Sequence, residues 1–441
     1  MELDTSLFPL ELKPPFRHVR GYGYEYVLPK CTEDYGNIPG QSMRSPFILH
    51  EDGKPLLLRH ATNVDIWYCG GGRYSQWGAG LYFAPSDNSD PNTNGKRYTV
   101  HMAQPSPDTH PLPQRVHVTL SHSCNLWCRI CRDKPITGPF MELRLFDKIA
   151  EELFPTTSEL RLDSGGEILL NRDLPLILKK IAQYGTPFFS STNGMLLTRE
   201  KACLLAESTL HHIQISLDSP VAETLEWIRR GAKFDKIINN IKLLVQARRD
   251  VGRPFLITLH AAIMRENVRQ LPDLVRLADE LGVEGVTGWH LFTQPHMHID
   301  SSCFWDQGTY DEMLEQTIAI ARGLNSFFYG PQPFANHTAD TGTAERGYCD
   351  YPEYGTYIDP DGTVCPCCIA PHIVLGNLRE TSFASIWNGD AYKRLRRTYR
   401  TDHPSVPRCK DCLTRRDTTA QYEPFFAPQH WTAVQQRMGL K

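Results

Sequence analysis

CNLWCRIC, residues 124–131, places three cysteines on one short stretch directly after the strand-like run 115–120. Thiolates are the usual protein ligands of iron–sulfur clusters. Three of them so close together, Cys124, Cys128 and Cys131, can hold three irons of a [4Fe–4S] cube and leave the fourth iron open. An open iron can bind the amino and carboxylate groups of S-adenosylmethionine, so the triad points to one-electron chemistry.

The triad resembles the cysteine motif of radical S-adenosylmethionine enzymes. The resemblance implies reductive cleavage of that cofactor to methionine and a 5′-deoxyadenosyl radical, which abstracts hydrogen from an unactivated C–H bond. It also implies an external electron donor such as flavodoxin or ferredoxin. The residue before the third cysteine is often aromatic in the family and packs near the adenine. Here it is Ile130, and Trp127 precedes the second cysteine instead, so both are candidates for that contact.

Two alternatives to a cluster exist for the triad. One is a zinc knuckle, although zinc takes four ligands and no fourth Cys or His completes a tight local set, with His122 the nearest candidate. The other is three unrelated buried cysteines. The supporting motifs below favour the cluster.

Alternating strands and helices follow the triad and decide the fold class. Strand-like runs lie at 115–120, 159–163, 187–191, 212–217, 255–263 and 285–292, and helical patterns at 141–154, 173–184, 199–207, 221–248, 267–281 and about 309–323. Such βα units predict an α/β fold, a partial (β/α)6 TIM-like barrel over residues 113–325. Active sites of these barrels lie at the carboxyl ends of the strands, where the triad follows the first strand.

A Gly-Gly-Glu run follows the second predicted strand. Gly165 and Gly166 let the backbone approach a bound group closely, and Glu167 can accept from an ammonium group. In the family, a run at this place holds the amino group of the cofactor's methionine, so the resemblance assigns these three residues to cofactor binding.

Polar residues also follow the third and fourth strands. Asn193 lies in an STNG stretch, and Ser216 and Asp218 lie in SLDS. Both stretches resemble family strand ends that bind the ribose and carboxylate of the cofactor. Loop and helix capping is the alternative for each residue. Arg229 or Arg230 could add a carboxylate clamp, and helix-surface charge explains them equally well.

A second cysteine-rich region lies near the C-terminus, within the predicted domain 340–420. Its six cysteines, together with a predicted hairpin turn at Asp361-Gly362 and the later GNL and IWN stretches, resemble the SPASM auxiliary-cluster domain or its shorter form, twitch. The resemblance implies a second [4Fe–4S] cluster, with Cys365 or Cys368 as possible substitutes in its ligand set. A structural zinc ribbon is the alternative. The ligands that the family pattern favours are Cys349, Cys367, Cys409 and Cys412.

Composition limits the partners and the compartment. The net charge is −3, the basic stretch 393–400 reads as a solvated helix face, and we expect no nucleic-acid partner. No apolar run is long enough to cross a membrane, and no signal-peptide pattern is present. Thirteen cysteines without an export signal favour metal clusters in a reducing, cytoplasmic compartment.

The flanking regions leave the substrate open. Residues 1–112 predict a β-rich domain for a substrate or partner, and residues 421–441 a polar tail. The stretch 66–98 suits either sugar binding or tight turns, and resembles pieces of bacterial polysaccharide-biosynthesis proteins loosely. We expect an oxidoreductase that dehydrogenates a carbinol carbon of a sugar, aminocyclitol or glycoside. The alternatives are an epimerase with Cys303 as catalytic hydrogen donor, an enzyme that modifies a ribosomal peptide, and a non-catalytic metalloprotein.

Overall fold

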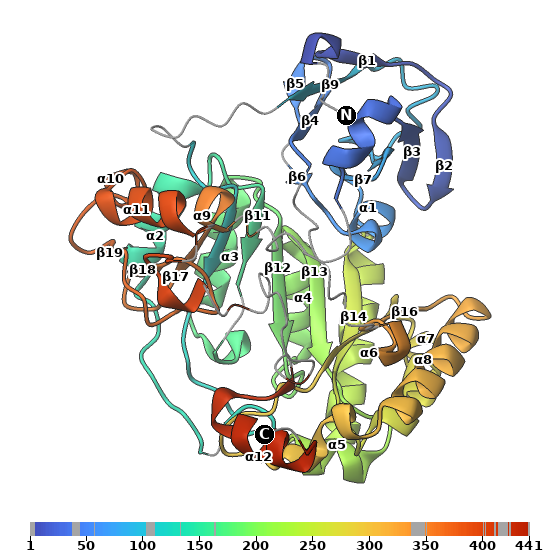
Figure 1. Ribbon diagram of the computed structural model, residues 1–441, viewed down its shortest axis with the longest axis vertical. Coiled ribbons are helices and arrows are strands. Elements are labelled where there is room, and N and C mark those ends of the chain that lie inside the picture. The colour runs from blue at the N-terminus through green and yellow to red at the C-terminus, as the bar shows by residue number, and fades with distance from the viewer. Residues whose placement is uncertain are drawn as a thin grey trace.

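The computed structural model describes most of the chain. The described residues are 5–37, 45–56, 58–102, 111–132, 134–162, 165–336, 349, 351–399, 401, 403–409, 412, 422 and 425–439. Three parts follow one another along the sequence: a β-rich N-terminal part, a curved α/β sheet and a C-terminal hairpin with short helices (Figure 1).

The N-terminal part consists of two sheets that pack around an aromatic core. Phe16, Phe47, Phe83 and Tyr98 fill this core and are nearly inaccessible to solvent. A short helix, α1 (Asn63–Tyr68), begins at the N-cap Thr62 and faces the rest of the molecule. The strands of the four-stranded sheet are, in order, β1 (Leu10–Leu12), β9 (Tyr98–Met102), β4 (Phe47–Glu51) and β5 (Lys54–Pro55); those of the five-stranded sheet are β2 (Arg17–Arg20), β3 (Gly23–Val27), β8 (Gly80–Phe83), β7 (Arg73–Trp77) and β6 (Leu58–Arg59).

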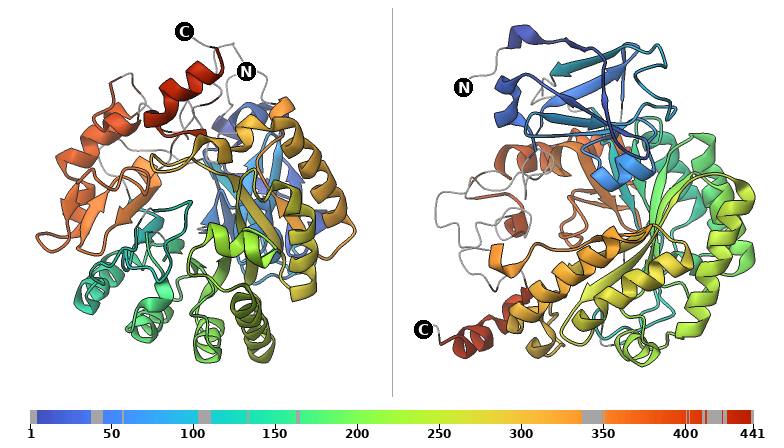
Figure 2. Two further views of the ribbon diagram at one scale, coloured as in Figure 1. Left: turned by 90° about the horizontal axis from the view of Figure 1, so that it is seen from below. Right: turned by 90° about the vertical axis from the view of Figure 1, so that its right-hand side faces the viewer.

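A parallel sheet forms the middle of the molecule and confirms the predicted fold class. Helices cover its convex side, as Figure 2 shows. Its strands are β10 (Arg115–Val118), β11 (Glu159–Arg161), β12 (Phe188–Thr192), β13 (Leu210–Ser216), β14 (Leu256–Ile263), β15 (Gly285–His290) and β16 (Phe327–Tyr329). The helices are α2 (Leu143–Leu153), α3 (Leu174–Gln183), α4 (Arg199–Glu207), α5 (Ala222–Ile228), α6 (Phe234–Val251), α7 (Leu271–Leu281) and α8 (Gln307–Arg322).

Side-chain alternation along the strands separates the two faces of the sheet. In β14, Ile257, Leu259 and Ala261 are fully buried in the core beneath the helices. Because successive side chains of a strand point to opposite faces, Thr258 and His260 lie on the concave face. At β14 the concave face therefore carries polar groups, unlike the face that packs on the helices.

One helix that the sequence predicts is divided into two helices in the structure. The pattern over 221–248 predicted a single helix, but α5 ends at Ile228 and α6 begins at Phe234. Gly231 lies between them at φ +89°, and a Cβ there would approach Leu126 and Trp127 to 3.2 Å. The break thus makes room for the cysteine stretch, a contact between distant segments that a local pattern does not contain.

The C-terminal hairpin extends the same sheet. Strand β17 (Gly355–Ile358) pairs in parallel with β10, and β18 (Thr363–Cys365) and β19 (Gly376–Asn377) follow it as antiparallel neighbours. The turn between β17 and β18 lies where the sequence predicts it, with Gly362 at φ +89°. Three short helices complete this part: α9 (Tyr351–Tyr354), α10 (Phe383–Trp387) and α11 (Asp390–Thr398).

The N-terminal part lies against the amino ends of the barrel strands. Cys69 Sγ lies 3.5 Å from the carbonyl oxygen of His211, near the start of β13, and the Tyr68 ring lies 5.8 Å from that of Phe327, at the start of β16. This is the end of the sheet opposite to the cysteine stretch.

The C-terminal segment packs at the carboxyl ends of the strands. Phe426 bridges to Thr293 in the loop after β15, and helix α12 (Trp431–Arg437) follows. In the described part of the chain, no helix has the length and apolar character needed to span a membrane.

Candidate active site

The loop after β10, residues 121–132, carries the three predicted cluster cysteines and is called the cysteine loop below. Cys128 is buried, Cys124 is half-buried and Cys131 is exposed, and none of them forms a disulfide. A turn brings the last two together, because the amide of Cys131 donates to the carbonyl of Cys128 at 3.1 Å. The triad therefore presents three free thiols from one loop.

Nitrogen donors surround these sulfur atoms. Asn193 Nδ2 lies 3.8 Å from Cys124 Sγ, and Arg132 Nε lies 3.4 Å from Cys131 Sγ. Burial raises the pKa of the Cys124 and Cys128 thiols, and the charge of Arg229 acts in the opposite direction on the pKa of Cys128. N–H groups directed at sulfur suit thiolates that bind a metal cluster.

The donor set fits a cluster better than a single ion. Among the described residues, no group of three His, Cys, Asp or Glu side chains converges closely enough to hold one metal ion. In a [4Fe–4S] cube each thiolate binds a different iron, so the three sulfurs need not converge on one point.

Gly165 and Gly166 let the second strand's loop approach the cysteine loop. A Cβ on Gly166 would lie 2.4 Å from the carbonyl oxygen of Ser121 and 2.5 Å from that of Ser123, while Gly165 has φ +71° and lies against the ring of His122. The amide of Glu167 then donates to Ser123 O at 2.8 Å. Gly166 is therefore required by a close approach of two backbones, and Gly165 by its positive φ and by the ring of His122.

The Glu167 carboxylate is buried and holds strand ends together. It accepts from Thr192 Oγ1 at 2.7 Å, from the Asn193 amide at 2.8 Å and from the Leu169 amide at 3.1 Å. Burial raises its pKa, and these three donors oppose that effect. In this structure the side chain fixes β12 relative to the Gly-Gly-Glu loop, and its predicted contact with the cofactor's amino group stays a prediction.

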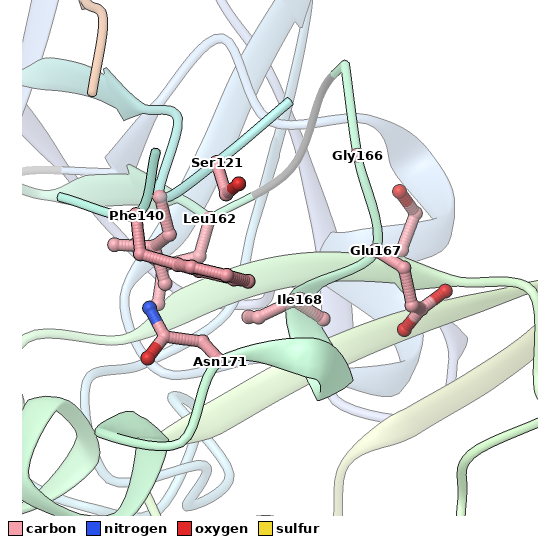
Figure 3. A pocket seen from close by; sticks show the side chains of 9 residues that line it. Ser121, Phe140, Leu162, Gly166, Glu167, Ile168 and Asn171 are labelled. Atoms are coloured by element: carbon pink, nitrogen blue, oxygen red, sulfur yellow. The ribbon is translucent and has the colours of Figure 1, made fainter. Parts of the chain in front are cut away.

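A small pocket lies beside this loop (Figure 3). Its lining includes Phe140, Glu167 and Asn171, and its accessible space is about 10 Å³, room for roughly one water. The Asn171 amide nitrogen is buried and has no hydrogen-bond partner among the residues that the structure describes. A pocket of this size suits a structural water, not a substrate.

Asn193 joins the cysteine loop to the end of β12. Besides Cys124 Sγ, its Nδ2 reaches Asn125 Oδ1 at 2.9 Å. Ser216 ends β13 and is half-buried on the concave face of the sheet. The structure brings both residues to the carboxyl ends of the strands, while their contacts with a cofactor stay predictions.

Asp218 forms a buried ion pair with Arg229. Arg229 donates to both carboxylate oxygens, with distances of 2.5 Å from Nε and 3.1 Å from Nη2, and the Ala262 amide adds a third donor at 2.9 Å. The pair holds the guanidinium near Cys128. Both charges of the pair act on the Cys128 thiol, because Arg229 lowers its pKa and Asp218 raises it.

The two candidates for the adenine contact lie in different places. Trp127 is 37% exposed and packs over Gly231. Ile130 packs instead against the buried residues Ile228, Met264 and Leu291. Ile130 therefore lies against a buried apolar cluster at the carboxyl ends of the strands, and the contact of either residue with the adenine stays a prediction.

The auxiliary cysteines lie around the C-terminal hairpin. Cys365 Sγ donates to the carbonyl oxygen of Pro371 at 3.0 Å, and burial raises the pKa of this thiol to about 12. Cys367 lies near Cys368 and Cys412, and burial also raises its pKa to about 12. Cys349 and Cys409 are half-buried against the main core, and Cys412 is buried.

Cys303 lies apart from the cysteine loop and from the auxiliary cysteines. It is 2% exposed and packs among aromatic residues of α8 and the C-terminal segment, including Tyr310, Phe425 and Phe426. Burial raises the pKa of its thiol to about 12.

Sequence reasoning missed two features of the site. His122 Nε2 lies 2.9 Å from Asp359 Oδ1 and so ties the cysteine loop to the C-terminal hairpin, a pairing across 237 positions that no local pattern reveals. Trp289 and Tyr329 lie exposed on the concave face, and the period-two spacing of Trp289 from Thr287 could have indicated this.

Comparison with known proteins agrees with this geometry. Residues 118–278 match the radical SAM superfamily model, and residues 349–413 match SPASM, an iron–sulfur cluster-binding domain. The first match implies a [4Fe–4S] cluster with S-adenosylmethionine and the second implies auxiliary clusters.

Curated relatives share about a quarter of their residues with this chain. The tungsten-containing aldehyde ferredoxin oxidoreductase cofactor-modifying protein of Pyrococcus furiosus is 27% identical over 68% of this chain and 87% of its own length. The AdoMet-dependent heme synthase of Oleidesulfovibrio alaskensis is 24% identical over 71% and 83%. The PqqA peptide cyclase of Bradyrhizobium diazoefficiens is 28% identical over 70% and 80%.

The fold also has solved counterparts. SuiB of Streptococcus suis, in its S-adenosylmethionine-bound structure, superposes with a TM-score of 0.53 at 17% identity, covering 68% of this chain and 72% of SuiB. The chain is a radical SAM enzyme with a C-terminal SPASM domain.

Proposed function

We propose that the enzyme oxidises a carbinol carbon of a sugar, aminocyclitol or glycoside to a carbonyl. The observation that carries the proposal is the pairing of β17 with β10, which builds the auxiliary-cluster domain onto the strand that leads into the cysteine loop. An oxidation of this kind ends with loss of a second electron, and an electron acceptor fixed beside the first cluster's loop suits that step.

Side-chain contacts reinforce this connection between the two domains. Besides the His122–Asp359 contact, Thr119 Oγ1 donates to the Tyr357 hydroxyl at 2.8 Å, and Tyr357 in turn donates to Asp359 at 3.1 Å. Side chains from both paired strands therefore hold the cysteine loop against the hairpin turn. Such a rigid connection supports electron transfer at a fixed distance between two clusters.

We assign the auxiliary ligands to Cys349, Cys367, Cys409 and Cys412. Cys365 suits this role less well because its S–H is used by Pro371. Cys368 also suits this role less well, because it is exposed and a cluster bound to it would be open to water at that edge.

The chain's own residues orient the first cluster and its cofactor. When bound, the cluster and S-adenosylmethionine supply the radical that removes a hydrogen atom. Cys124, Cys128 and Cys131 would hold the cluster, with the Asn193 amide directed at the Cys124 sulfur. Asp218 keeps Arg229 extended toward Cys128, where its positive charge favours the thiolate form.

The position of Cys303 favours oxidation over epimerisation. A thiol that returns a hydrogen atom has to face the substrate, and Cys303 is enclosed by Phe425, Phe426 and Tyr310. We therefore expect Cys303→Ala to leave the reaction unchanged. Deuterium from solvent appearing at one carbon of an otherwise unchanged product would overturn the oxidation.

Mass spectrometry of reconstituted enzyme tests the oxidation, because the product should be two hydrogens lighter than the substrate. Cys367→Ser should lose about four irons, one cube, and should still form 5′-deoxyadenosine but little carbonyl product. Cys365→Ser is the matched control, at the end of β18 and two residues before Cys367, and should keep both clusters. Equal iron content and equal product in the two variants would contradict the proposal.

A second candidate is modification of a ribosomal peptide. The observation in its favour is the 28% identity to a protein named PqqA peptide cyclase over 70% of this chain. Incubation with a precursor peptide encoded beside the gene tests it. A peptide product two hydrogens lighter, with no turnover of sugars, would replace the carbinol assignment.

A further inference from the structure

A row of side chains crosses the concave face from the cofactor side to the edge of the sheet. Strand register aligns Ser216 with His260, His260 with Thr287 and Thr287 with Tyr329. Paired residues in neighbouring strands share one face of a sheet. The row therefore begins at a residue assigned to the cofactor and ends at the last strand, β16.

Hydrogen bonds fix the ring of His260 within this row. Thr287 Oγ1 donates its single proton to Leu259 O at 3.3 Å, so it accepts from His260 Nδ1 at 2.8 Å and from Gln214 Nε2 at 3.2 Å. With the Thr287 proton given to Leu259 O, the proton of the neutral imidazole lies on Nδ1 and Nε2 carries the lone pair. In the described residues no partner bonds that Nε2.

Burial and the nearby charge of Arg229 lower the pKa of His260 to about 4. The imidazole is therefore neutral at neutral pH with Nε2 unprotonated, and the lowered pKa makes it a weaker proton acceptor than a free imidazole. His212, on the same face, differs in this respect because its Nε2 already contacts Thr258 Oγ1 at 2.8 Å.

Two aromatic side chains lie further along the same face and are open to solvent. Trp289 pairs with Ala262, two residues beyond His260, and is 60% exposed; Tyr329 is 55% exposed. Their ring centroids lie 6.5 Å apart at an angle of 80°. Two adjacent exposed aromatic rings are typical of a ligand or partner surface, unlike exposed apolar residues that are scattered singly.

The surroundings of these rings suit a saccharide better than a peptide. Gln214 adds a half-buried, neutral hydrogen-bonding group to the same face, and such groups match hydroxyls. A peptide chain commonly binds by adding a strand to a sheet edge. Strand β16 has only three residues and is followed by Gly330 and Pro331, which leaves little edge for that pairing.

We infer that this face is the substrate subsite, in which Trp289 and Tyr329 stack on a saccharide ring and His260 Nε2 takes the proton of the reacting hydroxyl. The inference rests on the proposed carbinol oxidation and specifies its base and its substrate contacts. His260 takes the proton of the O–H bond, while the bound cofactor would supply the radical that takes the hydrogen atom of the substrate carbon and the auxiliary cluster would supply the acceptor for the remaining electron. The C=O double bond forms, so atoms and electrons balance.

The base is tested by the ratio of two products in the reconstituted enzyme. His260→Asn keeps an N–H for Thr287 but has no acceptor at the Nε2 position. We expect the ratio of carbonyl product to 5′-deoxyadenosine to fall by about a hundredfold, the usual contribution of a general base. His212→Asn is the matched control and should leave the ratio unchanged. A loss of both products in parallel in His260→Asn would indicate a structural role and overturn the assignment.

The aromatic contacts are tested by binding, without turnover. Saturation-transfer NMR of the protein with methyl pyranosides of glucose, galactose and mannose, and with a tyrosine-containing tetrapeptide as the competing class, reports which ligand touches the rings. We expect contact at the C–H face of a pyranoside, and Trp289→Ala with Tyr329→Ala should weaken it about tenfold or more. Trp227→Ala, an exposed tryptophan on α5, is the matched control.

The outcomes separate the inference from the proposed function. If the wild-type enzyme forms a carbonyl sugar but Trp289→Ala with Tyr329→Ala binds as tightly as wild type, the subsite is wrong and the function stands. If only the tetrapeptide binds to wild type, and its contact is lost in the double variant, both the carbinol oxidation and the assignment of a saccharide to this subsite are wrong. If no probe binds to wild type, the subsite is overturned.

Discussion

Replacing Gly166 by alanine should separate two loops that carry the first cluster. The added Cβ would lie 2.4 Å from Ser121 O and 2.5 Å from Ser123 O, whereas such contacts are not found below 3.0 Å. The two carbonyls therefore have to retreat by about 0.5 Å each, and both belong to the loop just before Cys124.

The cost of Gly166→Ala can be estimated from the contacts that change. Overpacking of a well-packed site costs about 1–3 kcal/mol. The hydrogen bond from the Glu167 amide to Ser123 O, 2.8 Å long, contributes about a further 1 kcal/mol and should break. We expect the free energy of unfolding to fall by about 2–4 kcal/mol and iron content after anaerobic reconstitution to fall with it.

Urea unfolding and iron analysis measure these two effects. Gly308→Ala is the control, because a Cβ there meets nothing within 4 Å and α8 should be stabilised slightly. Unchanged stability and full iron content in Gly166→Ala would refute the close approach of the two loops.

Three further predictions concern charged groups. Asp218→Asn leaves the buried Arg229 without its counter-charge and should lower the free energy of unfolding in urea by about 3–5 kcal/mol. An unchanged free energy of unfolding would show that the ion pair is exposed to solvent. Burial raises the pKa of Glu51, but hydrogen bonds from Ser86 and Lys96 to its carboxylate outweigh burial and lower that pKa. The ionised carboxylate therefore stabilises the fold at pH values above 4.5, the pKa of the unfolded chain, and this stabilisation is lost as the pH falls below that value. The stability difference between wild type and Glu51→Gln should accordingly shrink in acid, and a constant difference would contradict this. Asp359→Ala removes the acceptor of His122 and should speed amide hydrogen exchange in β17 and the hairpin turn, while exchange in β14 stays unchanged.

The barrel strands could be predicted from sequence because their signals are local. Each predicted strand start lies within two residues of the observed one, since alternating apolar residues and flanking turns belong to the segment itself. The cysteine loop and the Gly-Gly-Glu run were found for the same reason.

Features that depend on contacts between distant segments could not be predicted. The break between α5 and α6 follows from the approach of Trp127 to Gly231, and the pairing of β17 with β10 joins segments far apart in the chain. The enclosure of Cys303 depends on Phe425 and Phe426 from the C-terminal segment. The sequence located this cysteine in a loop near the barrel but not what surrounds it.

The pairing of β10 with β17 has a consequence for how the chain folds during synthesis. Until the C-terminal hairpin emerges from the ribosome, the first barrel strand presents an unpaired edge, and such edges invite pairing with other chains. Contacts this distant in sequence also form slowly, because a long loop has to close first. The strand that leads into the cysteine loop is therefore completed last, so premature termination before residue 355 should yield an aggregation-prone chain.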